Sequence, residues 1–301
     1  MQILRLHSVC KDLKRFAGYG KDMVVGVEAV CQVCMHHCKI KPGGWGFCRA
    51  RKNEAGKIVC GNYGQVSSLA LDPIEKKPLN RFFPGSKILS VGSFGCNLRC
   101  PFCQNYEISM VKPGLSEDCY LSPKELTDIA EECRERGNIG VAFTYNEPLV
   151  GWEYVFDTAK LVREAGMKNI LVTNGTAAPE ILEKLLPYID AMNIDLKGFR
   201  EEYYRKLGGS LGVVKEFIVK AAAECHVELT TLIVPEENDS VSEMEEEAEW
   251  IASIDREIPL HVSRFFPQFQ MQNAGATAVE SVYSLAETAG KYLKYVYTGN
   301  C

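Results

Sequence analysis

The sequence lacks an uncharged apolar run of the roughly 18 residues that a membrane-spanning helix needs. Its first residues also lack the apolar core of a secretory signal peptide, because Arg5, Lys11 and Lys14 interrupt them. Basic residues are not in excess, since the 301 residues carry a formal net charge of -5. We therefore expect a cytoplasmic protein with no membrane partner and no broad surface for nucleic acid.

Hydrophobic residues make up 46% of the chain, which is enough for a large packed core. From about residue 88 onward, short β-branched runs alternate with longer helical patterns, as is typical of repeated βα units around a parallel sheet. Six units are fewer than the eight of a closed barrel, so we predict an α/β fold with a partial, open TIM-like barrel. The expected strands are 88–94, 139–146, 169–174, 191–196, 227–234 and 260–266.

Local signals predict where the intervening helices begin and end. Ser122 followed by Pro123 is typical of a helix start, and Gly137 and Gly166 are typical of helix ends. Serines at positions 240 and 242 predict another start before an acidic run. We expect that run, residues 243–249, to be a solvated helix face, because blocks of like charge usually face water.

Thirteen cysteines are present, and several of them stand only two or three residues apart. In a reducing compartment such spacing indicates metal ligands rather than disulfides. Cys96, Cys100 and Cys103 follow directly after the first expected strand, where a parallel sheet presents its ligands. Three thiolates can hold three corners of a 4Fe-4S cubane and leave one iron open for reaction, as catalytic zinc sites keep one open position.

Other interpretations of this triplet are a set of buried structural cysteines and a zinc site completed by a distant ligand. A bacterial ferredoxin motif would also end in C-x3-C-P. It fails here because Ser90 and Ser93 occupy the positions of two of its ligands.

The pattern C-x3-C-x-aromatic-C after a first barrel strand resembles the radical S-adenosylmethionine (radical SAM) superfamily. The resemblance implies a 4Fe-4S cluster on the three cysteines, bound S-adenosylmethionine and a reductant such as flavodoxin or ferredoxin. It also implies cofactor contacts near the cluster and at the ends of strands two to four: Phe102, Asn146, Glu147, Thr173, Asn174, Asp195 and Lys197.

These contacts have separate roles in the resemblance. Glu147 would accept from an ammonium, and a ring at position 102 would pack on adenine. The segments around Asn174 and Asp195 resemble motifs of glycyl-radical-enzyme activases that hold ribose hydroxyls and the methionyl carboxylate. A simple turn at Asn174 and a surface ion pair between Asp195 and Lys197 are the structural alternatives.

A wider set of segments resembles the AmmeMemoRadiSam-system radical SAM enzyme, over roughly residues 31–300. It implies an unknown substrate and AMMECR-like and Memo-like protein partners. Members are often named as pyruvate-formate-lyase activating enzymes, but Val172 stands where activases commonly have aspartate. The segments are DPIEKKPL at 72–79, FPGS at 83–86, GCNL at 95–98, FCQN at 102–105, HVSRFFP at 261–267 and YTGN at 297–300.

Residues 1–87 are rich in cysteine and then in glycine, and we predict that they form an extension ahead of a radical SAM core at 88–301. Its clustered cysteines predict a second metal site, for zinc or an iron–sulfur cluster, that folds the extension or passes electrons. Plain core cysteines are the alternative. The cysteines concerned are Cys31, Cys34, Cys38 and Cys48, with His36 and His37 between them.

Three functions follow from these patterns. The first is a radical SAM enzyme that cleaves S-adenosylmethionine reductively and abstracts hydrogen from an unknown substrate. The second is a glycyl-radical-enzyme activase. The third is a non-catalytic iron–sulfur or zinc scaffold protein, against which the open three-cysteine arrangement argues.

Overall fold

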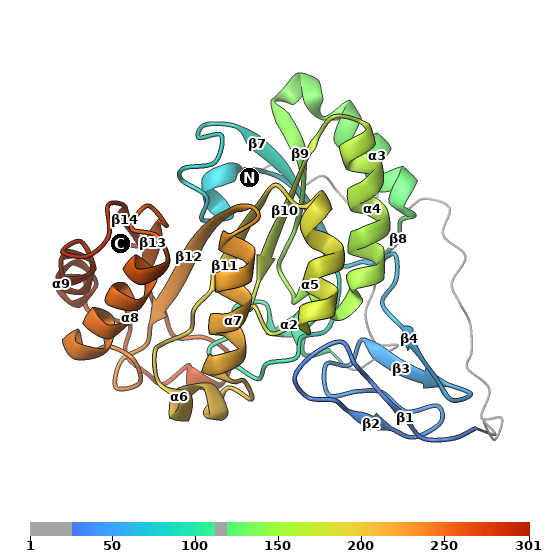
Figure 1. The fold of residues 1–301 in the computed structure, drawn as a ribbon, viewed down its shortest axis with the longest axis horizontal. Coiled ribbons are helices and arrows are strands. Elements are labelled where there is room, and N and C mark those ends of the chain that lie inside the picture. Colours follow the sequence, from blue (N-terminus) through green and yellow to red (C-terminus); the bar gives the residue numbers. More distant parts are fainter. Residues whose placement is uncertain (1–25, 112–118) are drawn as a thin grey trace.

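A computed structural model of the chain describes residues 26–111 and 119–301 (Figure 1). Its central feature is an eight-stranded sheet with the order β14-β13-β12-β11-β10-β9-β7-β6. All neighbours in this sheet are parallel except β6 and β7. The strands are β6 Ser68–Pro73, β7 Lys87–Gly92, β9 Asn138–Phe143, β10 Lys168–Thr173, β11 Ala191–Asp195, β12 His226–Ile233, β13 Leu260–Arg264 and β14 Val296–Gly299.

The prediction of an α/β fold with a parallel sheet is confirmed, and each of the six expected strands is present. Two edge strands, β6 and β14, were not predicted. β6 lies in the segment assigned to the N-terminal extension, yet it pairs with β7 in the main sheet. The division at residue 87 and the closure into a partial barrel both stay predictions.

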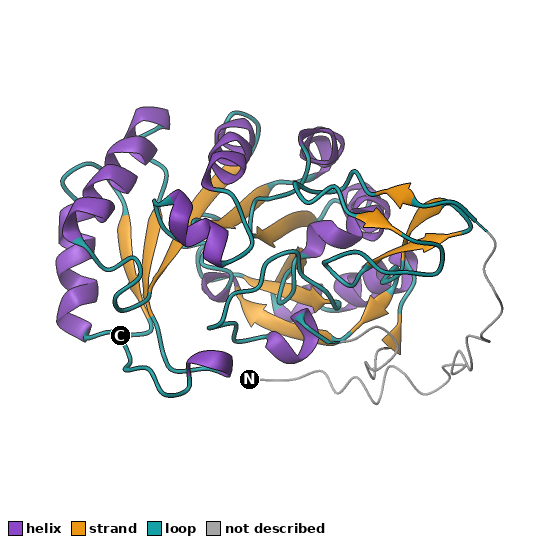
Figure 2. Cartoon of the chain, turned by 90° about the horizontal axis from the view of Figure 1, so that it is seen from below, coloured by secondary structure: helices purple, strands orange, loops and turns teal. Residues whose placement is uncertain are grey.

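Helices lie along one side of the row of strands, as the view in Figure 2 shows. The described ranges contain no helix that is both long and apolar enough to span a membrane. The helices are α2 Tyr106–Ser109, α3 Pro123–Glu132, α4 Trp152–Glu164, α5 Pro179–Leu185, α6 Glu201–Lys206, α7 Leu211–Ala222, α8 Val241–Ile254 and α9 Val279–Ala289, with short 3-10 turns at Ile74–Lys76, Arg134–Arg136, Pro148–Gly151, Leu186–Tyr188 and Phe269–Met271.

The predicted helix start at Ser122 is confirmed. Its side chain accepts from the backbone N–H of Glu125, and the Glu125 carboxylate accepts from the backbone N–H of Ser122, so two free donors of the first turn of α3 are satisfied. Gly137 (φ 88°) and Gly166 (φ 70°) lie just beyond helical segments in the left-handed region that favours glycine.

The acidic run at 243–249 was expected to face water, and this prediction is wrong for two of its glutamates. Glu243 and Glu247 stand four residues apart and therefore share the inner face of α8, where both are buried. The Phe199 backbone N–H donates to Glu243 at 2.6 Å, and the Thr231 hydroxyl donates to Glu247. Burial raises the pKa of Glu247 to about 8.

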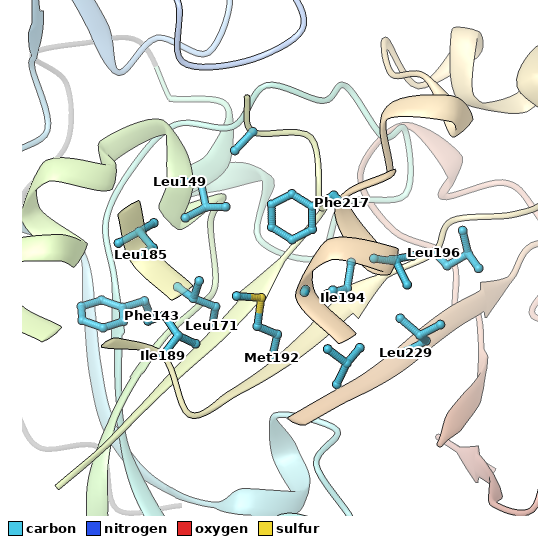
Figure 3. Packing of buried hydrophobic residues seen from close by; sticks show 14 of the residues in the cluster. Phe143, Leu149, Leu171, Leu185, Ile189, Met192, Ile194, Leu196, Phe217 and Leu229 are labelled. Carbon is cyan, nitrogen blue, oxygen red and sulfur yellow. The ribbon is translucent and has the colours of Figure 1, made fainter. Parts of the chain in front are cut away.

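The main hydrophobic core fills the space between the sheet and its helices (Figure 3). Side chains such as Leu171 and Met192 on the strands meet Leu185 on α5 and Phe217 on α7. A smaller cluster contains Ile74 and Leu79 from the segment after β6, together with residues of four strands. The DPIEKKPL segment thus packs against the sheet rather than lying free on the surface.

The N-terminal segment forms small antiparallel pairs, β1 Ala29–Val30 with β2 Lys39–Ile40 and β3 Arg51–Glu54 with β4 Lys57–Cys60 (Figure 1). Another pair joins β5 Gln65–Val66 to β8 Cys119–Tyr120. Residues 1–25 of the predicted extension lie outside the described ranges.

Several contacts join this segment to the main sheet and its helices. Cys34 forms an isolated bridge with Ala177, in the loop that follows β10. The Arg51 guanidinium forms a two-point ion pair with Glu153 on α4, at 2.6 and 2.7 Å. The N-terminal cysteines therefore lie near the carboxyl end of the sheet, where β10 ends.

Candidate functional site

The loop after β7 carries the cysteine triplet, and two asparagine side chains hold its backbone. Asn62 donates to the Phe94 carbonyl at 2.9 Å. Asn146 donates to the carbonyls of Phe94 and Gly95 at 3.2 and 3.0 Å and accepts from the Ser93 N–H at 2.9 Å. Asn146, predicted as a cofactor contact, thus braces the cysteine loop in this structure.

The three thiols of the triplet are close enough to interact electrostatically. Cys100 is buried, and the backbone N–H of Leu98 points at the Cys96 sulfur at 3.4 Å. Burial raises the pKa of Cys100 to about 11, while the nearby Lys197 ammonium acts in the opposite direction. A cationic metal centre would offset this burial cost, so the donor set suits a thiolate-bound cluster.

In residues 26–111 and 119–301, no group of three or more His, Cys, Asp or Glu side chains is arranged to hold a single metal ion. Ligands of one zinc ion must converge on one point, with Zn–S distances of about 2.3 Å. A cubane attaches each thiolate to a different iron, so its ligands stand farther apart.

Glu147 comes just after β9 and meets the end of β10. Its carboxylate accepts from the Thr173 hydroxyl at 2.7 Å, the Asn174 N–H at 2.8 Å and the Leu149 N–H at 3.0 Å. Only 4% of Glu147 is exposed. Burial raises its pKa to about 7, although the three hydrogen bonds act in the opposite direction. Three of the predicted contact residues therefore form one hydrogen-bonded group.

Asp195 ends β11 and forms an ion pair with Lys197 at 2.8 Å. Burial lowers the pKa of Lys197, but Asp195 and the thiolate of Cys100 outweigh this effect and raise it. Lys197 also acts on Cys103. The pair is therefore not an isolated surface ion pair, because its cation lies within electrostatic reach of the cysteine triplet.

Phe102, the predicted adenine contact, is only 5% exposed. It packs in an apolar cluster with Leu98, Tyr203, Leu207 and Phe265. In this structure the Phe102 ring therefore anchors the cysteine loop through apolar packing.

Sequence reasoning quoted Asn97 in a motif but assigned it no role. Its side chain hydrogen-bonds Thr176 at 2.8 Å and accepts from Asn174 at 3.0 Å. It also hydrogen-bonds the thiol of Cys34. The position of Asn97 between two cysteines of the motif was the one sign that it has a role. Its hydrogen-bond partners are 60 to 80 positions away in the chain, so the sequence could not identify them.

The sequence also contained no sign of a buried group of charged and polar side chains around the hydroxyl of Tyr145. Tyr145 has a positive φ of 73°. The Tyr145 hydroxyl donates to Asp72 at 2.8 Å, and Lys77 pairs with the same carboxylate at 2.9 Å. Asp72 and Lys77 are both buried. Two of these residues belong to the DPIEKKPL segment, whose charges therefore form an internal ion pair.

A parallel α/β sheet that carries three clustered thiols at its carboxyl end, beside buried charged groups, is the architecture of a metallocofactor enzyme. The model of the radical SAM superfamily matches residues 90–251, which is more than half of the chain. The chain belongs to the radical SAM superfamily. Membership implies an enzyme that uses a 4Fe-4S cluster and S-adenosylmethionine.

Similar proteins include an uncharacterized protein of Methanocaldococcus jannaschii, 40% identical over 90% of this chain and 80% of the relative. The pyruvate formate-lyase-activating enzyme of Clostridium pasteurianum is 27% identical over 53% of this chain and 67% of the relative. Among solved structures, Streptococcus suis SuiB matches with a TM-score of 0.56 and 14% identity, over 70% of this chain and 48% of SuiB. The last likeness concerns the fold alone.

Proposed function

We propose that this chain cleaves S-adenosylmethionine reductively at a 4Fe-4S cluster held by Cys96, Cys100 and Cys103, and then abstracts hydrogen from an unidentified substrate. When bound, the cluster would supply the electron that breaks the sulfonium bond and releases a 5'-deoxyadenosyl radical. The observation that carries the proposal is the thiol triplet at the end of β7, within electrostatic reach of Glu147 and Lys197.

Glu147 is the proposed acceptor for the methionyl ammonium. A carboxylate has about four lone-pair directions, and three of them are taken by Leu149, Thr173 and Asn174. Among the described residues, no lysine or arginine forms an ion pair with Glu147. A buried carboxylate with one free direction and a raised pKa is suited to a cation brought by the cofactor.

Lys197 is the proposed partner of the methionyl carboxylate, and Asp195 of the ribose hydroxyls. Thr173 and Asn174 orient Glu147 through their hydrogen bonds, and Asn146 holds the cysteine loop. Phe102 is retained as the proposed adenine contact. Each of these roles rests on the superfamily resemblance together with the position of the residue at a strand end or beside the cluster loop.

The protein partners are proposed from the AmmeMemoRadiSam resemblance: AMMECR-like and Memo-like proteins, and a flavodoxin or ferredoxin as reductant. We propose a cytoplasmic location. Similarity to a pyruvate formate-lyase-activating enzyme supports a glycyl-radical activase as the second candidate. Val172, in place of an aspartate before the Thr-Asn-Gly segment, argues against it.

The test is cofactor cleavage. Protein reconstituted anaerobically with iron and sulfide would be mixed with dithionite and S-adenosylmethionine, and 5'-deoxyadenosine would be quantified by mass spectrometry. We expect wild type to form it and Cys100→Ala to lose it. Cys225→Ala is the matched control, because Cys225 directly precedes β12, at the opposite end of the strands.

Equal 5'-deoxyadenosine from wild type and Cys100→Ala would refute the proposed cluster site. No product from wild type with full iron loading would favour the scaffold interpretation. The activase candidate predicts a glycyl radical signal, by electron paramagnetic resonance, in a cognate lyase.

A further inference from the structure

The four N-terminal cysteines lie together in the structure. The thiol of Cys34 interacts electrostatically with those of Cys31 and Cys38, and the thiol of Cys48 with those of Cys31 and Cys34. Three of them are at most 7% exposed: Cys31, Cys34 and Cys48. These four soft donors come from a segment of 18 positions, and four thiolates are the number and type of ligand that a thiophilic cluster takes.

Backbone N–H groups point at these sulfurs. The Phe47 N–H donates to the Cys38 sulfur at 3.4 Å. The Cys34 and Cys48 sulfurs each accept from the backbone N–H two residues later in the chain, at His36 and Ala50. The same two-residue pattern occurs in the triplet, at Cys96 and Cys103. Such N–H donors are placed to stabilise negative charge on a sulfur, which is the charge that a metal-bound thiolate carries.

The two cysteine sets are in direct contact through their backbones. The N–H of Cys96 donates to the carbonyl of Cys48 at 3.2 Å. The Arg99 guanidinium donates to the carbonyls of Cys96 and Phe47, and its charge interacts with the thiols of both Cys48 and Cys96. One cation therefore serves both sets.

A buried chain of hydrogen bonds also joins their sulfurs. Cys34 is hydrogen-bonded to the Asn97 side chain, whose carbonyl accepts from Asn174 at 3.0 Å. The same Asn174 amide lies 3.7 Å from the Cys96 sulfur. Asn97 and Asn174 are 1% and 5% exposed, so both amides of this chain are buried.

The far side of the N-terminal set borders a cavity of about 810 Å³ between this segment, α5 and α7. Cys34 and His37 line it, together with Glu180 and Lys220. Cys34 lines the cavity, whereas none of the three triplet cysteines does. The cavity, the N-terminal cysteines and the triplet therefore follow one another in the order that an electron-transfer path would need.

We propose that Cys31, Cys34, Cys38 and Cys48 hold a second iron–sulfur cluster, through which a protein reductant of the ferredoxin or flavodoxin class reduces the cluster on the triplet. One electron enters from the reductant and one leaves to the triplet side, so the second cluster is regenerated and no covalent bond changes. The inference rests on the proposed function, since it assumes a cluster on the triplet. Asn97 is a positioning residue for the transfer.

The first test counts metals in purified, anaerobically reconstituted protein. We expect about eight irons per chain in wild type, and about four in Cys34→Ser, in Cys38→Ser and in Cys100→Ser. Cys225→Ala should keep the wild-type value. Mössbauer spectra should resolve two cluster environments in wild type and one in each cysteine-to-serine variant.

Zinc in place of the second set of irons would overturn the inference, because zinc has no redox chemistry. Unchanged metal content in both Cys34→Ser and Cys38→Ser would overturn it as well. Neither outcome touches the proposed function, which fails if iron-loaded protein forms no 5'-deoxyadenosine or if wild type and Cys100→Ala form equal amounts of it.

The second test measures the route. Freeze-quench electron paramagnetic resonance, without S-adenosylmethionine, would follow the reduction of the triplet cluster by reduced ferredoxin or flavodoxin. In Asn97→Leu we expect the iron content to stay at the wild-type value and the rate of this reduction to fall about tenfold. Asn169→Leu removes an equally buried asparagine near the start of β10 and should not change the rate. An unchanged rate in Asn97→Leu would refute the electron-transfer path.

Discussion

At Gly95 the cysteine loop lies close against the N-terminal segment, and Gly95→Ala should separate them. Its φ is 92°, which costs an L-residue about 1–2 kcal/mol. A β-carbon there would lie 2.7 Å from the Cys48 carbonyl oxygen and 3.0 Å from the Ala50 β-carbon. Relieving such overlap costs about 1–3 kcal/mol, so we expect a total loss of about 2–5 kcal/mol.

Gly137 provides a matched control. Its φ of 88° is nearly the same, but no atom lies within 4 Å of the position that its β-carbon would occupy. Gly137→Ala should therefore cost only the conformational part, about 1–2 kcal/mol. The difference between the two variants isolates the contact between Gly95 and the carbonyl of Cys48.

Both variants would be unfolded anaerobically in urea, with the free energy taken from midpoint and slope and with iron measured on the folded samples. We expect Gly95→Ala to be the less stable variant and to lose iron. If both variants lower the free energy of unfolding by the same amount, there is no steric contact between a β-carbon at Gly95 and the carbonyl of Cys48.

Two further predictions concern buried charges away from the cysteines. Burial raises the pKa of Glu228, but hydrogen bonds from His226 and His261 outweigh it and hold the pKa at about 2. This stabilisation, on the order of 3 kcal/mol, is present above the usual carboxyl pKa and is lost as pH falls toward 2. Urea midpoints between pH 7 and 3 should fall more steeply in wild type than in Glu228→Gln, and parallel curves would contradict the pairing. Lys77→Met leaves Asp72 without its closest cation and should cost about 3–5 kcal/mol in urea, while adding Asp72→Asn should recover most of it. A double variant as unstable as Lys77→Met would show that the ion pair is not the cause.

Much of the fold could be predicted because its signals are local. Parallel strands buried on both faces are short apolar runs, and Ser122 and Gly137 mark helix ends through bonds to their own neighbours. The errors arose where tertiary contacts act instead. Glu247 is buried because Thr231, on a strand 16 positions earlier, supplies a hydrogen bond that no helical pattern reveals. The edge strand β6 exists because β7 pairs with it.

The sequence by itself determined the class of chemistry, because the spacing of Cys96, Cys100 and Cys103 and their place after a strand are local properties of the chain. Only the tertiary structure decided what surrounds them. Glu147 is enclosed by groups from the next strand, and Cys48 contacts Cys96 across 48 positions. Such contacts depend on the packing of distant segments, which residue spacing does not encode, and that packing brought the two cysteine sets together.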